Sequence, residues 1–163
     1  MRVLFDANVI MDFIIKRKPF SDDAEKAIGL CMNTDDIHAS IAAHTVPNLF
    51  YILRKHLTTE QRRDILLEIY NMFTVVSIDV DKLISALQNE EFSDFEDCLQ
   101  VECAKHFEAA YIVTRNAKDF SGSTVTVIEP SDFVNLLTLA AIPDEIHETT
   151  TKITKIDTDT DAP

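Results

Sequence analysis

The sequence predicts a single α/β domain in which a parallel sheet of about five strands is covered by helices on both faces. Short apolar segments alternate with segments of helical periodicity along the chain, and strands joined through helices run parallel in such folds. The length of 163 residues fits one domain, and 46% hydrophobic with 26% charged residues is typical of a folded protein. We expect the domain to span residues 1–143 and the polar segment 144–163 to be a mobile tail.

Five short, mostly apolar segments are expected to form the strands of the sheet. They cover residues 3–5, 37–40, 74–78, 111–114 and 125–128. The first segment stops at Asp6, and the fourth is followed by the polar segment 115–123, which is expected to be a loop.

The segments between the strands are expected to be helices, because their apolar residues recur at helical spacing. In the first helix this spacing runs from Val9 to Ile14, and the segment 16–19 ends it. The expected starts of later helices are a cap at Ser21, capping boxes at Thr58 with Gln61 and at Ser93 with Glu96, and the pair Pro130 and Ser131.

Composition argues against several classes of protein. The two glycines, Gly29 and Gly122, are too few for the glycine-rich loops that hold nucleotide phosphates. Three cysteines without a CxxC pair argue against a disulfide framework or a thiolate zinc site. The net charge, 15 − 28 = −13, argues against a broad electrostatic grip on DNA. The chain carries no apolar run near the about 20 residues of a membrane helix, so we expect a cytoplasmic protein without membrane contact.

Several carboxylates fall where the sheet is expected to end. Asp6 ends the first strand, and Asp119 follows the fourth strand in the segment that also contains Arg115 and Asn116. Asp94 and Asp97 lie three residues apart at the amino end of the helix that leads into the fourth strand, and so share a face. Ligands of open parallel sheets bind beyond the carboxyl ends of the strands. Clustered carboxylates at this edge predict a site for Mg²⁺ or Mn²⁺.

Each acid also has a simpler interpretation when taken alone. Asp94, Glu96 and Asp97 could serve only the start of their helix, through capping or the helix dipole. Asp119 could belong to an ordinary turn. Asp6 is harder to explain in this way, because an acid at the end of an apolar strand is costly to bury without a partner.

Three stretches resemble PIN-domain ribonucleases, the family that includes VapC-like toxins of toxin–antitoxin pairs. They are DANVIMDF at residues 6–13, VPNLFYILRK at residues 46–55 and DFEDCLQVECAKHFEAAYIVTRNAKDF at residues 94–120. The resemblance covers roughly the first 135 residues, in the family's order. It implies a three-layer α/β/α sandwich with a central parallel sheet, and Mg²⁺- or Mn²⁺-dependent endonuclease activity on RNA.

The resemblance also assigns roles to single residues. It implies that Asp6, Asp97 and Asp119 bind the metal, with Asp94 as a plausible partner. Two positions that usually carry acids in the family are Asn48 and Asn116 here. Each change removes a negative charge but keeps an oxygen, so it leaves open single-metal binding or loss of activity. Asn48 and Asn116 are expected to orient water or the scissile phosphate.

Substrate contacts and partners can also be expected from the placement of these residues and from the resemblance. Arg115 is expected to contact phosphate, and Asn8 is a further expected substrate contact. The basic segments 16–18, 54–55 and 62–63 are more typical of solvated helix ends than of an RNA surface. The expected partner is an RNA substrate, with an antitoxin protein and a second copy of the chain left open. The alternative function is a catalytically weak or inactive PIN-like module that binds RNA or a protein.

Overall fold

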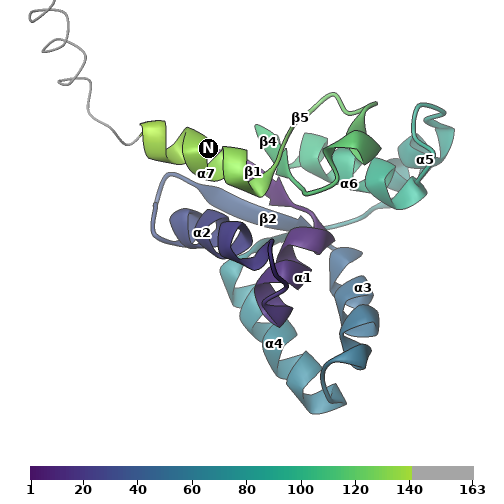
Figure 1. The fold of residues 1–163 in the computed structure, drawn as a ribbon. Helices are drawn as coiled ribbons and strands as arrows, with labels where there is room; N and C mark the ends of the chain where they lie inside the picture. The colour runs from purple at the N-terminus through teal and green to yellow at the C-terminus, as the bar shows by residue number, and fades with distance from the viewer. Residues whose placement is uncertain (141–163) are drawn as a thin grey trace, which may run out of the picture.

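We describe residues 1–140 of the chain in a computed structural model, so the predicted tail at 144–163 and the predicted domain end at 143 lie outside the described residues (Figure 1). Five parallel strands form one sheet in the order β3-β2-β1-β4-β5. Their bounds are β1 (Arg2–Phe5), β2 (His38–Ala42), β3 (Thr74–Val76), β4 (Tyr111–Val113) and β5 (Thr126–Ile128). The predicted parallel sheet is therefore confirmed.

Helices connect all consecutive strands of the described chain. The α-helices are α1 (Ala7–Ile15), α2 (Ser21–Met32), α3 (Thr45–Ile52), α4 (Thr59–Met72), α5 (Val80–Gln88), α6 (Phe95–His106) and α7 (Pro130–Ala140), and the 3-10 helices are η1 (Leu53–Lys55) and η2 (Ala117–Phe120). The segment 115–123, expected to be a loop, thus contains the short helix η2. Strand ends differ from expectation by at most two residues, because hydrogen-bonded pairing rather than apolar content sets them.

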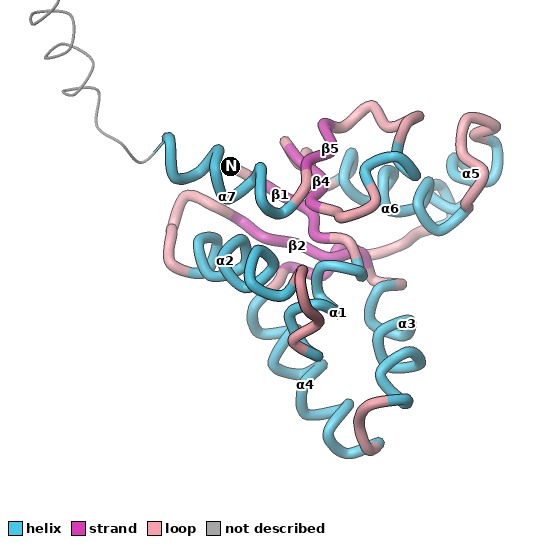
Figure 2. The backbone as a smooth tube through the Cα atoms, in the orientation of Figure 1, coloured by secondary structure: helices cyan, strands magenta, loops and turns pink. Residues whose placement is uncertain are grey.

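The helices cover both faces of the sheet and produce the three-layer α/β/α sandwich that was predicted (Figure 2). Successive side chains of β1 point to opposite faces. Val3 and Phe5 pack in the larger core with α1, α2, α3, α4 and α7, whereas Leu4 packs with α6 on the other face. Helix α5 packs against α6 on that second face. Alternate side chains of the buried strand β1 therefore belong to the two cores on opposite faces of the sheet.

The predicted helix caps have mixed outcomes. The capping box of Thr58 and Gln61 is confirmed, with both reciprocal hydrogen bonds present. The box predicted for Ser93 and Glu96 is wrong, because Asp94 is the N-cap of α6 and its carboxylate accepts a hydrogen bond from the Glu96 N–H at 2.7 Å. Ser21 is the first residue of α2 and makes no capping hydrogen bond, so its predicted cap is also wrong.

The strand order reverses beside β1, and this reversal creates a switch point at the carboxyl ends of β1 and β4. The chain builds β2 and β3 on one side of β1, then crosses to place β4 on the other side. Phe5 of β1 pairs with Val113 of β4, so the residues that follow the two strands emerge next to each other. In open α/β sheets such a switch point at the carboxyl ends of the strands is where ligands bind.

Candidate active site

A cleft of about 440 Å³ opens at this switch point. Segments distant in the sequence line it: the start of α1, helix η1, the start of α6 and the turn after β4. The predicted site residues within it are Asp6, Asn8, Asp94, Asp97, Arg115, Asn116 and Asp119. Every site residue predicted from the sequence except Asn48 therefore lines one cleft.

Asp6 lies at the centre of a hydrogen-bond network between β1, β4 and α6. Its side chain is buried, and its Oδ1 accepts a hydrogen bond from Gln100 Nε2 at 2.9 Å. Its Oδ2 accepts one from Thr114 Oγ1 at 2.7 Å and another from Asn8 Nδ2. Donors of this kind fix the orientation of the carboxylate. The sequence predicted Asp6, but Gln100 and Thr114 were not identified from it.

Asn8 forms hydrogen bonds that connect the turns after β1 and β4. Besides Asp6, its Nδ2 donates to Thr114 Oγ1 at 3.0 Å, and its Oδ1 accepts from the Arg115 N–H at 3.3 Å. The Asn116 N–H donates to the same Thr114 Oγ1 at 3.0 Å. The polar atoms of Asn8 thus have partners within the protein, and its expected contact with substrate stays a prediction.

Asp97 shows most directly that the acids act on one another. It is partly buried in the first turn of α6. Burial, together with the nearby charges of Asp94, Asp6, Asp119 and Glu96, raises the pKa of Asp97 to about 7. A carboxyl group with so many like charges near it favours either a proton or a bound cation.

Asp94 combines two roles that the sequence left as alternatives. It caps α6, as a helix-start residue would, and it also lines the cleft. Asp119 lies in η2 and reaches the same cleft, where its charge acts on Asp97. Helix capping and membership of the acidic group are therefore compatible for Asp94.

Glu96 is an acid of the cleft that the sequence interpretation assigned only to capping. Asn48 does not line the cleft, and its Nδ2 instead donates a hydrogen bond to Glu96 Oε1. His44 Nε2 lies 3.9 Å from the same oxygen. Burial raises the pKa of Glu96, while the hydrogen bond from Asn48 acts in the opposite direction. A carboxylate from α6 therefore lies beside the asparagine that stands where the family usually has an acid.

A hard divalent cation fits the chemistry of this cleft, since carboxylate and amide oxygens are the ligands that Mg²⁺ and Mn²⁺ prefer. Within residues 1–140, no three His, Cys, Asp or Glu side chains are arranged closely enough to hold a metal ion among themselves. The predicted group of four metal-binding acids thus shares a cleft without forming a compact ligand set. The raised pKa of Asp97 marks the negative charge that a cation would offset.

Arg115 has a partner that was not predicted. Its Nε pairs with Oδ2 of Asp12, a fully buried residue of α1, and its guanidinium carbon lies 4.3 Å from the centre of the Phe20 ring. Arg17 Nη1 lies 3.8 Å from the other Asp12 oxygen. Burial raises the pKa of Asp12, although both arginines act against this shift. The sequence offered one signal for Asp12, which is an acid six residues after Asp6 on the predicted first helix.

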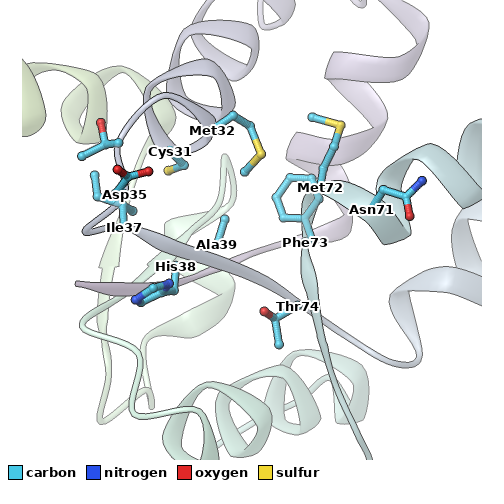
Figure 3. Close-up of a pocket in the computed structure, with 11 residues that line it drawn as sticks. Cys31, Met32, Asp35, Ile37, His38, Ala39, Asn71, Met72, Phe73 and Thr74 are labelled. Atoms are coloured by element: carbon cyan, nitrogen blue, oxygen red, sulfur yellow. The ribbon is translucent and has the colours of Figure 1, made fainter.

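A second cavity of about 360 Å³ lies at the opposite edge of the sheet, near the start of β2 and β3 (Figure 3). Asp35 is the single carboxylate among its lining residues. Burial raises the pKa of the Cys31 thiol in its wall to about 12, so Cys31 is not a reactive thiolate. This cavity therefore lacks the group of carboxylates that lines the cleft beside Asp6.

A PIN-domain family model matches residues 2–118 of the chain. The chain belongs to the PIN-domain family. The match includes Asp6 and Asp97, and it ends one residue before Asp119. Comparison with curated proteins gives no match.

Solved structures similar to this PIN domain include VapBC proteins and a toxin–antitoxin complex. VapBC2 from Rickettsia felis, bound to a promoter DNA fragment, has 15% identity and a TM-score of 0.60, covering 79% of this chain and 98% of that chain. A toxin–antitoxin complex from Klebsiella pneumoniae has 23% identity and a TM-score of 0.60, covering 78% and 97%. VapBC-1 from nontypeable Haemophilus influenzae has 15% identity and a TM-score of 0.60, covering 80% and 99%. At these identities the similarity establishes the fold of the PIN domain.

Among the described helices of the PIN domain, none has the length and apolarity required to cross a bilayer.

Proposed function

We propose that this PIN domain is a metal-dependent endoribonuclease that hydrolyses RNA phosphodiester bonds. The observation that supports this most directly is the raised pKa of Asp97, caused by burial and by four further acids around one cleft. Paired or clustered acids with perturbed pKa values at a sheet switch point are typical of catalytic sites.

Asp97, Asp94 and Asp119 are the residues we assign to Mg²⁺ or Mn²⁺, together with Asp6. When bound, the cation would lower the pKa of a water molecule and offset negative charge on the phosphate. The chain's own residues prepare this chemistry. Gln100 and Thr114 orient Asp6, because both donate hydrogen bonds to its oxygens.

Glu96 and the two asparagines complete the assignment. We assign Glu96, held by Asn48, to an outer position where it orients a water molecule. Asn116 lies in the cleft and offers an amide group that can hydrogen-bond a phosphate or water. Arg115 is assigned to phosphate binding, because a guanidinium group at the cleft offers paired donors.

A protein partner is part of the proposal. The similar structure from Klebsiella pneumoniae is a toxin–antitoxin complex, and the one from Rickettsia felis is VapBC2 bound to promoter DNA. We propose that this chain is likewise the toxin of such a pair, and that an antitoxin controls it.

Cleavage of a labelled, single-stranded RNA in the presence of Mn²⁺ tests the enzymatic part of this proposal. We expect Asp6→Asn and Asp97→Asn to reduce the rate by at least about 100-fold, a typical loss for a group that stabilises the transition state. Asp64→Asn, on the exposed side of α4, is the matched control and should cleave like the original chain. Equal rates for Asp6→Asn and Asp64→Asn would contradict the assignment.

A non-cleaving RNA- or protein-binding module is the second candidate function. Asn48 and Asn116 favour it, because each lowers the negative charge available to a cation. Thermal melting with increasing Mn²⁺ separates the two candidates, since a ligand that binds only the folded state raises the transition temperature. A rise that disappears in Asp97→Asn supports the nuclease, whereas no rise together with no cleavage supports the module.

A further inference from the structure

Basic residues as well as acids line the cleft beside Asp6. Three of them are cationic, namely Arg17, Lys55 and Arg115. They come from the segment after α1, from η1 and from the turn after β4. Cationic groups in an acidic cleft are unexpected in a chain of net charge −13, and they offer contacts to a polyanion.

Asp12 organises two of these groups. Its carboxylate is fully buried, with Arg115 Nε paired to one oxygen and Arg17 Nη1 at 3.8 Å from the other. The Arg17 backbone N–H also donates to the Asp12 carbonyl oxygen at 3.1 Å. One carboxylate therefore faces two guanidinium groups, which leaves one positive charge in excess at the wall of the cleft.

The two arginines differ in exposure. The Arg115 side chain is 18% exposed, and its guanidinium carbon lies over the Phe20 ring. The Arg17 side chain lines the cleft and is 51% exposed, so part of it stays accessible to a ligand. A buried ion pair contributes little net stability, because desolvation of the charges offsets their attraction. The arrangement is better explained by the orientation that it imposes on the two arginines.

We propose that Arg17 and Arg115, held by the buried Asp12, form a binding subsite for a backbone phosphate of a single RNA strand, next to the scissile phosphate. Guanidinium groups bind phosphate through paired hydrogen bonds, and a pair of them suits its several oxygens. Asp12 is a positioning residue in this arrangement, since it is buried and acts through the arginines. This inference rests on the proposed function, because the acids of the cleft are taken as the place of hydrolysis.

Binding of a fluorescein-labelled single-stranded RNA decamer to the full chain in EDTA tests the subsite without cleavage. We expect Arg17→Ala to weaken binding about tenfold and to lower the slope of log K against log salt by about 0.7, the value for one lost phosphate contact. Lys16→Ala is the matched control, because Lys16 is adjacent, pairs with Glu25 at 2.9 Å and does not line the cleft. It should bind RNA within about twofold of the original chain.

Asp12→Asn tests the positioning role. Because Asp12 acts through the arginines, the loss caused by Arg17→Ala should be much smaller in the Asp12→Asn background, which a double-mutant cycle measures. Should Asp12→Asn fail to fold, Phe20→Leu loosens Arg115 from the surface and should weaken binding about threefold. Equal binding by Arg17→Ala and Lys16→Ala, or no RNA binding by the original chain at low salt, would overturn the subsite.

The result is distinguishable from failure of the proposed function. Absence of Mn²⁺-dependent cleavage, with the expected loss of RNA binding in Arg17→Ala, rejects the nuclease and keeps the phosphate subsite. Cleavage that Arg17→Ala leaves unchanged in both KM and kcat keeps the nuclease and rejects the subsite. An increase in KM with little change in kcat supports both, because it shows a loss of uniform substrate binding.

Discussion

Gln100 donates a hydrogen bond of 2.9 Å to Asp6 across 94 positions of sequence, and it joins the middle of α6 to the end of β1. Both side chains are buried, with Gln100 2% and Asp6 6% exposed. The bond fixes one oxygen of an acid that we assign to the cation. It also explains why a polar residue lies among the otherwise apolar buried residues of α6.

Replacement of Gln100 by Ala should therefore harm both stability and activity. We expect a loss of about 1–3 kcal/mol in the free energy of unfolding, because Asp6 would keep a buried oxygen without its donor. RNA cleavage should fall about tenfold through loss of orientation. Urea unfolding and the cleavage rate measure the two effects. An unchanged rate in a variant that is destabilised would limit Gln100 to a structural role.

The pKa of Asp97 predicts how stability depends on pH. This pKa is about 7 in the folded protein, against an ordinary value of 3.8, so the folded state binds the proton more tightly than the unfolded state. The contribution of this group to stability is therefore greatest below the ordinary value and is lost as pH rises through 7. The Asp97→Asn variant has no carboxyl group to ionise at this position, so it avoids this loss of stability. Its melting temperature should exceed that of the original chain by several degrees at pH 8 without cations.

The same difference in melting temperature should become small at pH 5, where Asp97 itself is protonated in the fold. Asp64→Asn, an exposed acid of α4, serves as the control and should track the original chain at both pH values. A constant difference between Asp97→Asn and the original chain at pH 5 and pH 8 would contradict the assigned cause.

Asn48→Asp tests the position where the family usually has an acid. The substitution removes the donor to Glu96 and places a second carboxylate beside it, so like charges repel. We expect a lower melting temperature at pH 8 in EDTA and a larger rise on addition of Mn²⁺ than for the original chain. Asn48→Ser, which removes the amide without adding charge, should lack the larger rise. Identical Mn²⁺ responses for the two variants would show that position 48 does not influence the cation.

Thr58→Ala separates stability from function. It removes the side-chain half of the capping box of α4, for which a loss of about 1 kcal/mol is typical. Thr58 does not line the cleft, so the rate of RNA cleavage measured well below the melting temperature should stay unchanged. A large loss of activity would imply that the ordering of α4 is coupled to the cleft.

The fold and the membership of the cleft were largely predictable from the sequence. Short apolar segments separated by helical ones determine a parallel sheet, and strand ends in such a sheet meet at one edge. That rule alone brings Asp6, the turn at 115–119 and the start of α6 together. The capping box at Ser93 failed, because Asp94 offers a stronger acceptor one residue later and the spacing pattern does not distinguish the two.

What the sequence by itself determined is the order of the elements and the edge at which the acids gather, because both depend on local patterns and on general rules of chain connection. Tertiary structure alone decided which side chains meet: Gln100 with Asp6, Asn48 with Glu96, and Asp12 with Arg115. Those pairs join distant segments, and their geometry depends on how whole helices pack on the sheet. No local spacing encodes that packing, since it results from the burial of both cores at once.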